Sequence, residues 1–358
     1  MLDKARPSVS IIIKAFNEER HIATAIESAL AALAGLDGEV ILADGASTDR
    51  TIAIARNYPI RIVRLADAAD RSCGAGAQLG FQYSRGKFLC LMDGDMRLHA
   101  DFPAAAVRYL EQHANVAGVG GAVIDRDLAN LEYAQRVKRF DPDRRPGAVT
   151  RLNGSGLYRR AAIEAAGYLT DRNLHGGEEL ELAARLQTAG WTLARIPMIA
   201  VDHFGHAGSP YALLLRRIVT RNAFGPGEII RASIGRPHFR FIVRHDRNFR
   251  ICCLVSAWWA MIAGGALVAN GSAGWLGVAG MVVVPFVAMS LRWRSVRNGI
   301  YSVAVWNSHA LCFLPGFLRS RAQPTDWLAS RMIADQVVAG PAAAEAANSA
   351  PLASTTTR

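Results

Sequence analysis

Two carboxylates one residue apart follow a short apolar run in the first third of the chain. Asp93-Gly94-Asp95 comes directly after segment 87–92, in which five apolar residues follow Lys87, and such a run is typical of a buried strand. Ligands of open α/β sheets bind at the carboxyl ends of the strands. Paired acidic oxygens at that edge suit a hard divalent cation that carries the phosphates of a substrate.

A further acid lies at the end of another predicted strand. Asp44 follows the apolar segment 39–43, and the turn after it contains Ser47 and Thr48. Either hydroxyl could cap a helix predicted over 49–57. Two strand ends that face the same edge would thus both carry acids.

Three acids begin a predicted helix later in the chain. Glu178, Glu179 and Glu181 precede Leu182 and Leu186, which share one helix face. A carboxylate at this position could serve as a catalytic base. The alternative is an ordinary acidic first turn that the helix macrodipole stabilises.

Taken together, these segments resemble family 2 glycosyltransferases. The matching segments are Ser8–Glu19 (the opening strand and Asn-Glu turn), Asp44–Thr51 (Asp-Asp-Gly-Ser-x-Asp-x-Thr), Asp93–Asp95 (Asp-x-Asp) and Glu178–Leu186 (Glu-Asp-x-Asp-Leu-x-x-Arg-Leu). Their order and spacing agree over roughly the first two hundred residues. The resemblance implies a GT-A fold, which is a Rossmann-like, doubly wound mixed α/β sheet that binds a nucleotide sugar.

The resemblance also implies where the donor and a metal ion bind. The implied nucleotide-sugar-binding residues are Ala15, Phe16, Asn17, Glu18, Asp44, Arg71 and Asp93. Asp93 and Asp95 would hold Mg2+ or Mn2+ against the diphosphate of a UDP- or GDP-linked sugar. His203 or His206 could add a metal ligand, although a histidine at a strand end can equally be a hydrogen-bonded structural residue.

The acceptor side follows in the same way. Glu179 stands where the family usually has Asp and would deprotonate the acceptor hydroxyl, with Glu178 and Glu181 as alternatives. The glycine-rich acceptor loop would consist of Asn153, Gly154, Ser155 and Gly156. Attack from the face opposite the leaving diphosphate is a single displacement, which would invert the anomeric configuration.

The second half of the chain has a different character. No charged residue occurs from Ile251 to Leu291, which is long enough for two membrane spans of about twenty residues, and Asn270 marks the turn. Segment 204–250 carries nine arginines against two acids, a net +7 of the chain's +11. These arginines predict anionic membrane lipids rather than nucleic acid as partners, with the catalytic domain cytoplasmic.

The sequence therefore predicts a multi-pass protein of the plasma membrane. The predicted parts are a GT-A catalytic domain at 1–205, basic interfacial or juxtamembrane helices at 206–250, a transmembrane hairpin at 251–291, a basic loop with an interfacial or re-entrant helix at 292–338, and a disordered tail at 339–358. The predicted role is in the synthesis of cell-envelope polysaccharide.

The predicted activity is that of an inverting hexosyltransferase with a lipid-linked or glycan acceptor. Transfer of a single sugar is favoured because Arg217–Asn222 lacks the Gln and Trp of the Gln-x-x-Arg-Trp motif of polymerising relatives. Two alternatives remain open. One is a polyprenyl-phosphate sugar transferase, and the other is a catalytically silent membrane scaffold with the same fold.

Overall fold

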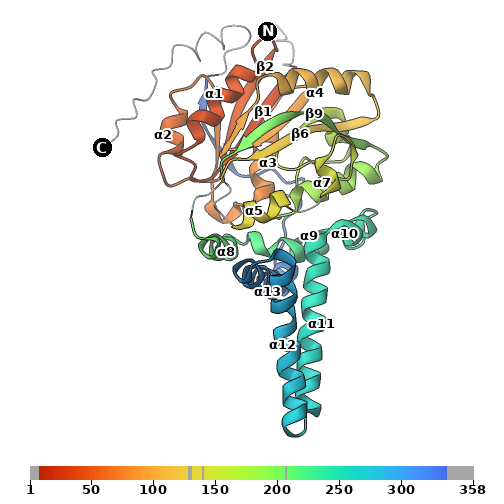
Figure 1. Cartoon of the computed structure of the whole chain (residues 1–358). Coiled ribbons are helices and arrows are strands. Elements are labelled where there is room, and N and C mark those ends of the chain that lie inside the picture. The colour runs from red at the N-terminus through yellow and green to blue at the C-terminus, as the bar shows by residue number, and fades with distance from the viewer. Residues whose placement is uncertain (1–7, 128–130, 139–140, 206–207, 337–358) are drawn as a thin grey trace, which may run out of the picture.

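The computed structural model describes residues 8–127, 131–138, 141–205 and 208–336. An α/β domain forms one end of the molecule, and helices from the second half of the chain extend from it (Figure 1). The predicted disordered tail and His206 lie outside the described residues.

A single mixed sheet forms the centre of the α/β domain. Its strands are β1 (Val9–Ala15), β2 (Gly38–Asp44), β3 (Arg61–Leu65), β4 (Phe88–Asp93), β5 (Met96–Leu98), β6 (Val116–Asp125), β7 (Gly147–Val149), β8 (Gly156–Arg159), β9 (Thr192–His203) and β10 (Ser330–Asp335). Within the described residues their order is β10-β3-β2-β1-β4-β8-β6-β9-β5, with β7 paired to β9. Strands β1 to β4 pair in parallel, whereas β8 and β10 run antiparallel to their neighbours.

Helices cover both faces of this sheet, as expected for a doubly wound fold. They are α1 (Ile22–Ala32), α2 (Thr51–Ala55), α3 (Cys73–Tyr83), α4 (Asp101–Gln112), α6 (Arg160–Ala165) and α7 (Glu178–Thr188). A further helix, α5 (Leu131–Lys138), contacts α8 and α13 of the later helices instead. Ile11 and Ile13 of β1 pack in the core that contains α1 and α4, while Ile12 packs in the core that contains α3 and α7. The unbroken apolar run of β1 thus reflects burial on both faces.

Between residues 208 and 336 the structure has six α-helices after the sheet strands β1 to β9. They are α8 (Pro210–Val219), α9 (Gly225–Ser233), α10 (Phe239–His245), α11 (Arg247–Val268), α12 (Gly271–Trp293) and α13 (Val296–Leu318). The helices α11 and α12 lie side by side and extend away from the domain (Figure 1). Both are long and apolar enough to cross a membrane, with mean hydropathies of 2.0 and 1.9. Many of their apolar side chains are exposed, and Leu267 is 87% exposed.

Two features of the structure differ from the sequence prediction. Segment 330–335 returns to the α/β domain as β10 and pairs with β3, so the predicted division at residue 205 omits one strand of the sheet. The α2 helix begins at Thr51 without a side-chain cap from Ser47 or Thr48. Both of those residues instead bond Asn17, and Asp49 accepts the backbone N–H of Thr51 at 2.9 Å.

Candidate active site

Three strand ends bring the predicted site residues to one edge of the sheet. In the parallel register, Ala15 of β1 lies opposite Asp44 of β2, and Lys14 lies opposite Asp93 of β4. A cavity of about 360 Å3 opens at this edge. Its lining includes Phe16, Glu18, Gly45, Arg71, Asp93, Asp95, Glu178, Glu179 and His203 from the α/β domain, and Arg216 and Arg217 from α8.

The Asp44 carboxylate lies fully buried beside this cavity. Its Oδ2 accepts the backbone N–H of Ser47 at 3.0 Å and lies 3.5 Å from Nε of Arg64. Burial raises the pKa of Asp44, while the Ser47 hydrogen bonds and the Arg64 charge oppose that rise. Oδ1 is also buried and has no hydrogen-bond partner among the described residues. A buried acceptor of this kind fits a ligand that donates an N–H or O–H.

The Asn-Glu turn is fixed to the loop after β2. Asn17 adopts a left-handed backbone conformation with φ 57°. Its N–H donates to Ser47 Oγ at 3.0 Å, and its side-chain oxygen accepts the N–H of Thr48 at 2.8 Å. Beside this turn, the Arg71 guanidinium lies 3.7 Å from the centroid of the Phe16 ring. The predicted donor-binding residues Ala15 to Glu18, Asp44 and Arg71 are therefore neighbours in the structure.

A lysine that the sequence analysis did not assign links the two acidic segments. Lys14 Nζ lies 2.9 Å from Asp93 Oδ1 and 3.6 Å from Glu178 Oε1. Burial lowers the pKa of Lys14, but the neighbouring Asp93 and Glu178 carboxylates outweigh burial and raise it well above its ordinary value. Lys14 thus stays charged and holds Glu178 against the end of β4.

The three acids at the start of α7 have different environments. Glu178 is buried, and burial together with Glu179 raises its pKa despite the charge of Lys14. Glu181 is also buried and accepts hydrogen bonds from Arg185 at 2.7 and 2.9 Å and from the Tyr168 hydroxyl at 2.8 Å. Glu179 is half-buried, lines the cavity and has no hydrogen bond or salt bridge among the described residues. Glu179 is thus the acid of the three that is least committed to other groups.

The second acid of Asp93-Gly94-Asp95 belongs to another cluster. Asp95 Oδ2 lies 3.3 Å from His203 Nε2, and His203 Nδ1 lies 2.9 Å from Asp125 Oδ1. Burial lowers the pKa of His203, but the hydrogen bonds to Asp125 and Asp95 outweigh it and raise the pKa to about 9. His203 is therefore protonated at neutral pH. Ligation of a metal by His203, which stays a prediction, would require loss of that proton.

The charge balance near Asp95 fits a divalent cation. Burial raises the pKa of Glu18 to about 8, and the charges of Asp95 and Asp93 raise it as well. Glu18, Asp93 and Asp95 thus add three acidic side chains to the lining of the cavity, and hard oxygen donors are the ligands that Mg2+ and Mn2+ prefer. Within the described residues, no three His, Cys, Asp or Glu side chains form a complete metal site on their own. A cation held here would need further oxygens from a ligand.

The predicted acceptor loop lies against both acidic segments. A Cβ placed on Gly154 would come within 3.1 Å of Asp93 Oδ2 and 4.0 Å of Glu179 Oε1. Ser155 is buried, and its hydroxyl has no hydrogen-bond partner among the described residues. A side chain at position 154 would occupy the space between Asp93 and Glu179.

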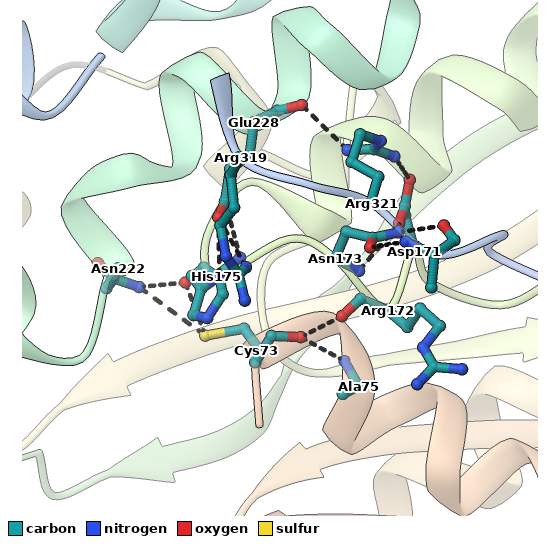
Figure 2. A network of polar contacts seen from close by, with 12 residues as sticks. Cys73, Ala75, Asp171, Arg172, Asn173, His175, Asn222, Glu228, Arg319 and Arg321 are labelled. Carbon is teal, nitrogen blue, oxygen red and sulfur yellow. Dashed lines mark hydrogen bonds and ion pairs between the residues drawn. The ribbon is translucent and has the colours of Figure 1, made fainter. Parts of the chain in front are cut away.

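The loop before α7 is held by residues from distant parts of the chain (Figure 2). Glu228 of α9 accepts the N–H of His175 at 2.8 Å and lies 2.9 Å from its Nδ1. Arg319, just after α13, lies 3.2 Å from Glu228 Oε1. Asn222 and Cys73 both donate to the carbonyl of His175, at 2.8 and 3.0 Å. These contacts fix the backbone that leads into Glu178 and Glu179.

Comparison with known proteins agrees with this arrangement. The model of the family described as glycosyl transferase family 2 matches residues 10–166. This match, which covers somewhat less than half of the chain, makes the N-terminal part of the α/β domain similar to glycosyl transferase family 2. It is 34% identical over 133 residues to the succinoglycan biosynthesis protein ExoO of Rhizobium meliloti (strain 1021), which is 37% of this chain and 36% of that protein.

A second curated relative is the dodecaprenyl-phosphate galacturonate synthase of Rhizobium johnstonii (strain DSM 114642 / LMG 32736 / 3841). It is 34% identical over 99 residues, which is 25% of this chain and 28% of that protein. The chain thus matches only about a third of the length of these two relatives.

A solved structure resembles nearly the whole chain. The mannosyltransferase PcManGT from Pyrobaculum calidifontis, in complex with GDP-Man and Mn2+, has a TM-score of 0.59 at 18% sequence identity. The match covers 87% of this chain and 88% of that one. At this identity the likeness concerns the fold, and it confirms the predicted GT-A-type domain followed by C-terminal helices.

Sequence reasoning missed three residues of the site. Lys14 interrupts the apolar run of β1 directly before the Asn-Glu turn, and a charge at such a position was the available signal. Asp125 and Arg136 bond each other and His203. No pattern in the neighbouring sequence indicates this contact, because the two residues lie 78 and 67 positions before His203 in the chain.

Proposed function

We propose that the protein is an inverting glycosyltransferase that moves a single hexose from a nucleoside-diphosphate sugar to a membrane-associated, lipid-linked or glycan acceptor. The observation that carries this proposal is the placement of Glu179. This half-buried carboxylate has no hydrogen bond or ion pair within the described part of the chain, and it lines the same cavity as Asp93 and Asp95, across the glycine of the acceptor loop. Donor-phosphate binding and proton removal would then occur at opposite sides of one sugar.

The donor half of the cavity suits a nucleotide. The buried Oδ1 of Asp44 would accept an N–H of the base, while Phe16 and Arg71 would flank it. Asp93 and Asp95 would hold Mg2+ or Mn2+, which supplies positive charge to offset the charge that develops on the leaving diphosphate. The complex of PcManGT with GDP-Man and Mn2+ is consistent with a nucleotide-sugar donor and a divalent metal.

The acceptor half supplies the base. The acceptor hydroxyl oxygen forms a bond to C1 of the sugar as the bond from C1 to the diphosphate oxygen breaks. The electron pair of the broken bond leaves with the nucleoside diphosphate, and Glu179 takes the hydroxyl proton. Glu178 is a poorer candidate because it is buried and lies 3.6 Å from Lys14, and Glu181 is bound by Arg185 and Tyr168.

The acceptor would reach the site from a membrane. The apolar helices α11 and α12 would form a transmembrane hairpin, and the arginine-rich helices at 206–250 would lie against anionic headgroups on the cytoplasmic side. The name of the Rhizobium meliloti relative, a succinoglycan biosynthesis protein, is consistent with a role in envelope polysaccharide synthesis.

A polyprenyl-phosphate sugar transferase is the second candidate. In that reaction a phosphate oxygen attacks C1 and needs little help from a base. Arg136, Arg216 and Arg217 line the same cavity and could attract such a phosphate. The name of the dodecaprenyl-phosphate galacturonate synthase relative makes this reaction class a natural alternative.

The deciding experiment measures nucleotide binding and sugar transfer by the purified full chain. A thermal-shift screen of UDP, GDP and their sugars, with Mn2+ or EDTA, identifies the donor because ligands of the folded state raise the melting temperature. Slow hydrolysis of the identified sugar nucleotide then separates an enzyme from a silent scaffold. A protein that no nucleotide diphosphate stabilises, and that releases none, would contradict the proposal.

A further inference from the structure

A second cavity lies where the α/β domain meets the long helices. This juxtamembrane cavity has a volume of about 710 Å3, within the range of ligand sites. It is lined by Glu132, Gln135, Arg136 and Lys138 of α5, Arg217 of α8, Arg247, Asn248 and Ile251 of α11, Met289, Arg292 and Trp293 of α12, and Tyr301, Ser302, Val305, Trp306 and His309 of α13.

The lining combines positive charge with apolar surface. Five of its side chains are basic, namely Arg136, Lys138, Arg217, Arg247 and Arg292, against the single acid Glu132. Glu132 lies 2.6 Å from Arg217, and Arg136 pairs with Asp125, which does not line this cavity. The lining itself thus keeps a net positive charge. A cavity with this excess of cationic donors suits an anion, and phosphate oxygens accept the forked hydrogen bonds of arginine well.

The apolar part of the lining comes from the candidate membrane spans. Ile251 and Met289 lie on the two helices of the hairpin, at the end next to the domain, and Val305 and Trp306 lie on α13. The indole Nε1 of Trp293 is buried without a hydrogen-bond partner among the described residues. A ligand with an anionic head and an apolar stem would match both parts of the lining.

This cavity is connected to the candidate active site through two residues. Arg136 and Arg217 line both cavities. On its other side, Arg136 contacts Asp125 and His203, and His203 in turn lies 3.3 Å from Asp95. A ligand in the juxtamembrane cavity would therefore lie next to the sugar-transfer site without occupying it.

We propose that the juxtamembrane cavity binds the phosphate or diphosphate of a lipid carrier to which the acceptor saccharide is attached. This inference rests on the proposed function. The isoprenoid or other apolar stem would lie along Ile251, Met289 and Val305, and the saccharide would pass between Arg136 and Arg217 to reach Glu179. The phosphate is thus an anchor outside the reaction centre, and a sugar hydroxyl is the nucleophile.

The test compares two pairs of variants that lose the same charge from matched positions. Arg247→Gln with Arg292→Gln alters the lining of the cavity. Arg250→Gln with Arg294→Gln alters two arginines on or directly after the same helices that do not line it. The full chain is placed in phosphatidylcholine nanodiscs. The probes are polyprenyl diphosphate, phosphatidylglycerol and inorganic diphosphate, and binding of each is measured by titration.

We expect polyprenyl diphosphate to bind at least tenfold more weakly to the cavity pair and within about twofold of wild type to the control pair. A photoreactive first isoprene unit should label Ile251, Met289 or Val305. The thermal shift by the donor nucleotide should be unchanged in both pairs, and it reports on the proposed function separately. If the cavity pair does not fold, the single variants Arg247→Gln and Arg292→Gln replace it, each with the same direction of effect.

Three results would overturn the inference. If polyprenyl diphosphate binds both variant pairs equally more weakly than wild type, the lipid is attracted by the general positive charge of the surface. Competition by phosphatidylglycerol as strong as that by polyprenyl diphosphate would make the cavity a site for bulk anionic lipid, and equal binding of inorganic diphosphate would remove the need for a lipid. Unchanged binding in the cavity pair would exclude this cavity, even if the donor nucleotide still stabilises the protein.

Discussion

Replacing Glu179 by Gln tests the assignment of the base most directly. The substitution keeps the shape of the side chain and removes its basicity. Because Glu179 has no hydrogen bond or salt bridge among the described residues, we expect the free energy of unfolding to change by less than about 0.5 kcal/mol. Loss of general-base catalysis typically lowers turnover by about a hundredfold to ten thousandfold, or about 3–5 kcal/mol in the barrier.

The neighbouring acids provide controls that predict different outcomes. Glu181→Gln breaks a buried ion pair in which Arg185 donates twice, so it should cost about 3–5 kcal/mol of stability and lower the melting temperature. Glu178→Gln replaces a buried carboxyl group that Lys14 already engages at 3.6 Å. We therefore expect Glu178→Gln to lower turnover by less than about tenfold.

The assay measures release of the nucleoside diphosphate at saturating donor and acceptor, with donor binding followed by thermal shift. We expect Glu179→Gln to bind the donor normally while kcat falls, which is the signature of an interaction made in the transition state. Turnover within about threefold of wild type would refute the reasoning. If Glu178→Gln lowers turnover as much as Glu179→Gln does, the base would be assigned to Glu178 instead. Normal turnover in all three variants would favour the polyprenyl-phosphate reaction.

Three further predictions concern the metal, pH and the hairpin. Asp95→Asn should abolish the Mn2+-dependent part of the thermal shift by the donor nucleotide, and equal shifts with Mn2+ and with EDTA in wild type would remove the metal from the site. His203 has a pKa raised from 6.5 to about 9, so its contribution to stability is full below pH 6.5 and is lost as pH rises through about 9. The difference in melting temperature between wild type and His203→Gln should thus shrink from pH 6 to pH 10, and a constant difference would contradict the ion pairs. Asn270→Cys, at the turn between α11 and α12, should react with a membrane-impermeant maleimide from outside intact cells, unlike a cysteine placed at Arg221.

Local patterns in the sequence predicted the elements that carry the main acids. The apolar runs before Asp44 and Asp93 end where β2 and β4 end, and the acids at 178–181 begin α7. These predictions succeeded because a buried strand or helix face requires apolar residues at regular positions in the neighbouring sequence.

Contacts between distant segments left no such trace. Strand β10 has only six residues, and its partner β3 lies more than 260 positions earlier in the chain. Lys14 meets Glu178 only because β1 lies beside β4 and α7 begins at the same edge. The candidate helix cap at Ser47 and Thr48 failed for the same reason, since the Asn17 turn engages both residues.

The chain after the hairpin also holds the candidate base in position. Arg319 bonds Glu228, which in turn fixes His175, while Arg321 pairs with Asp171 of the same loop (Figure 2). That loop ends at Gly177, which has a left-handed backbone conformation with φ 85° and directly precedes the α7 helix.

The candidate base and the helices α11 to α13 are therefore not separable units. A truncation at residue 251 would remove the candidate membrane spans together with Arg319, Arg321 and β10. Loss of activity in such a fragment would follow from a displaced α7 as readily as from a lost membrane anchor. Point substitutions that leave the segment 319–335 intact are thus the only clean way to ask what the hairpin contributes to catalysis.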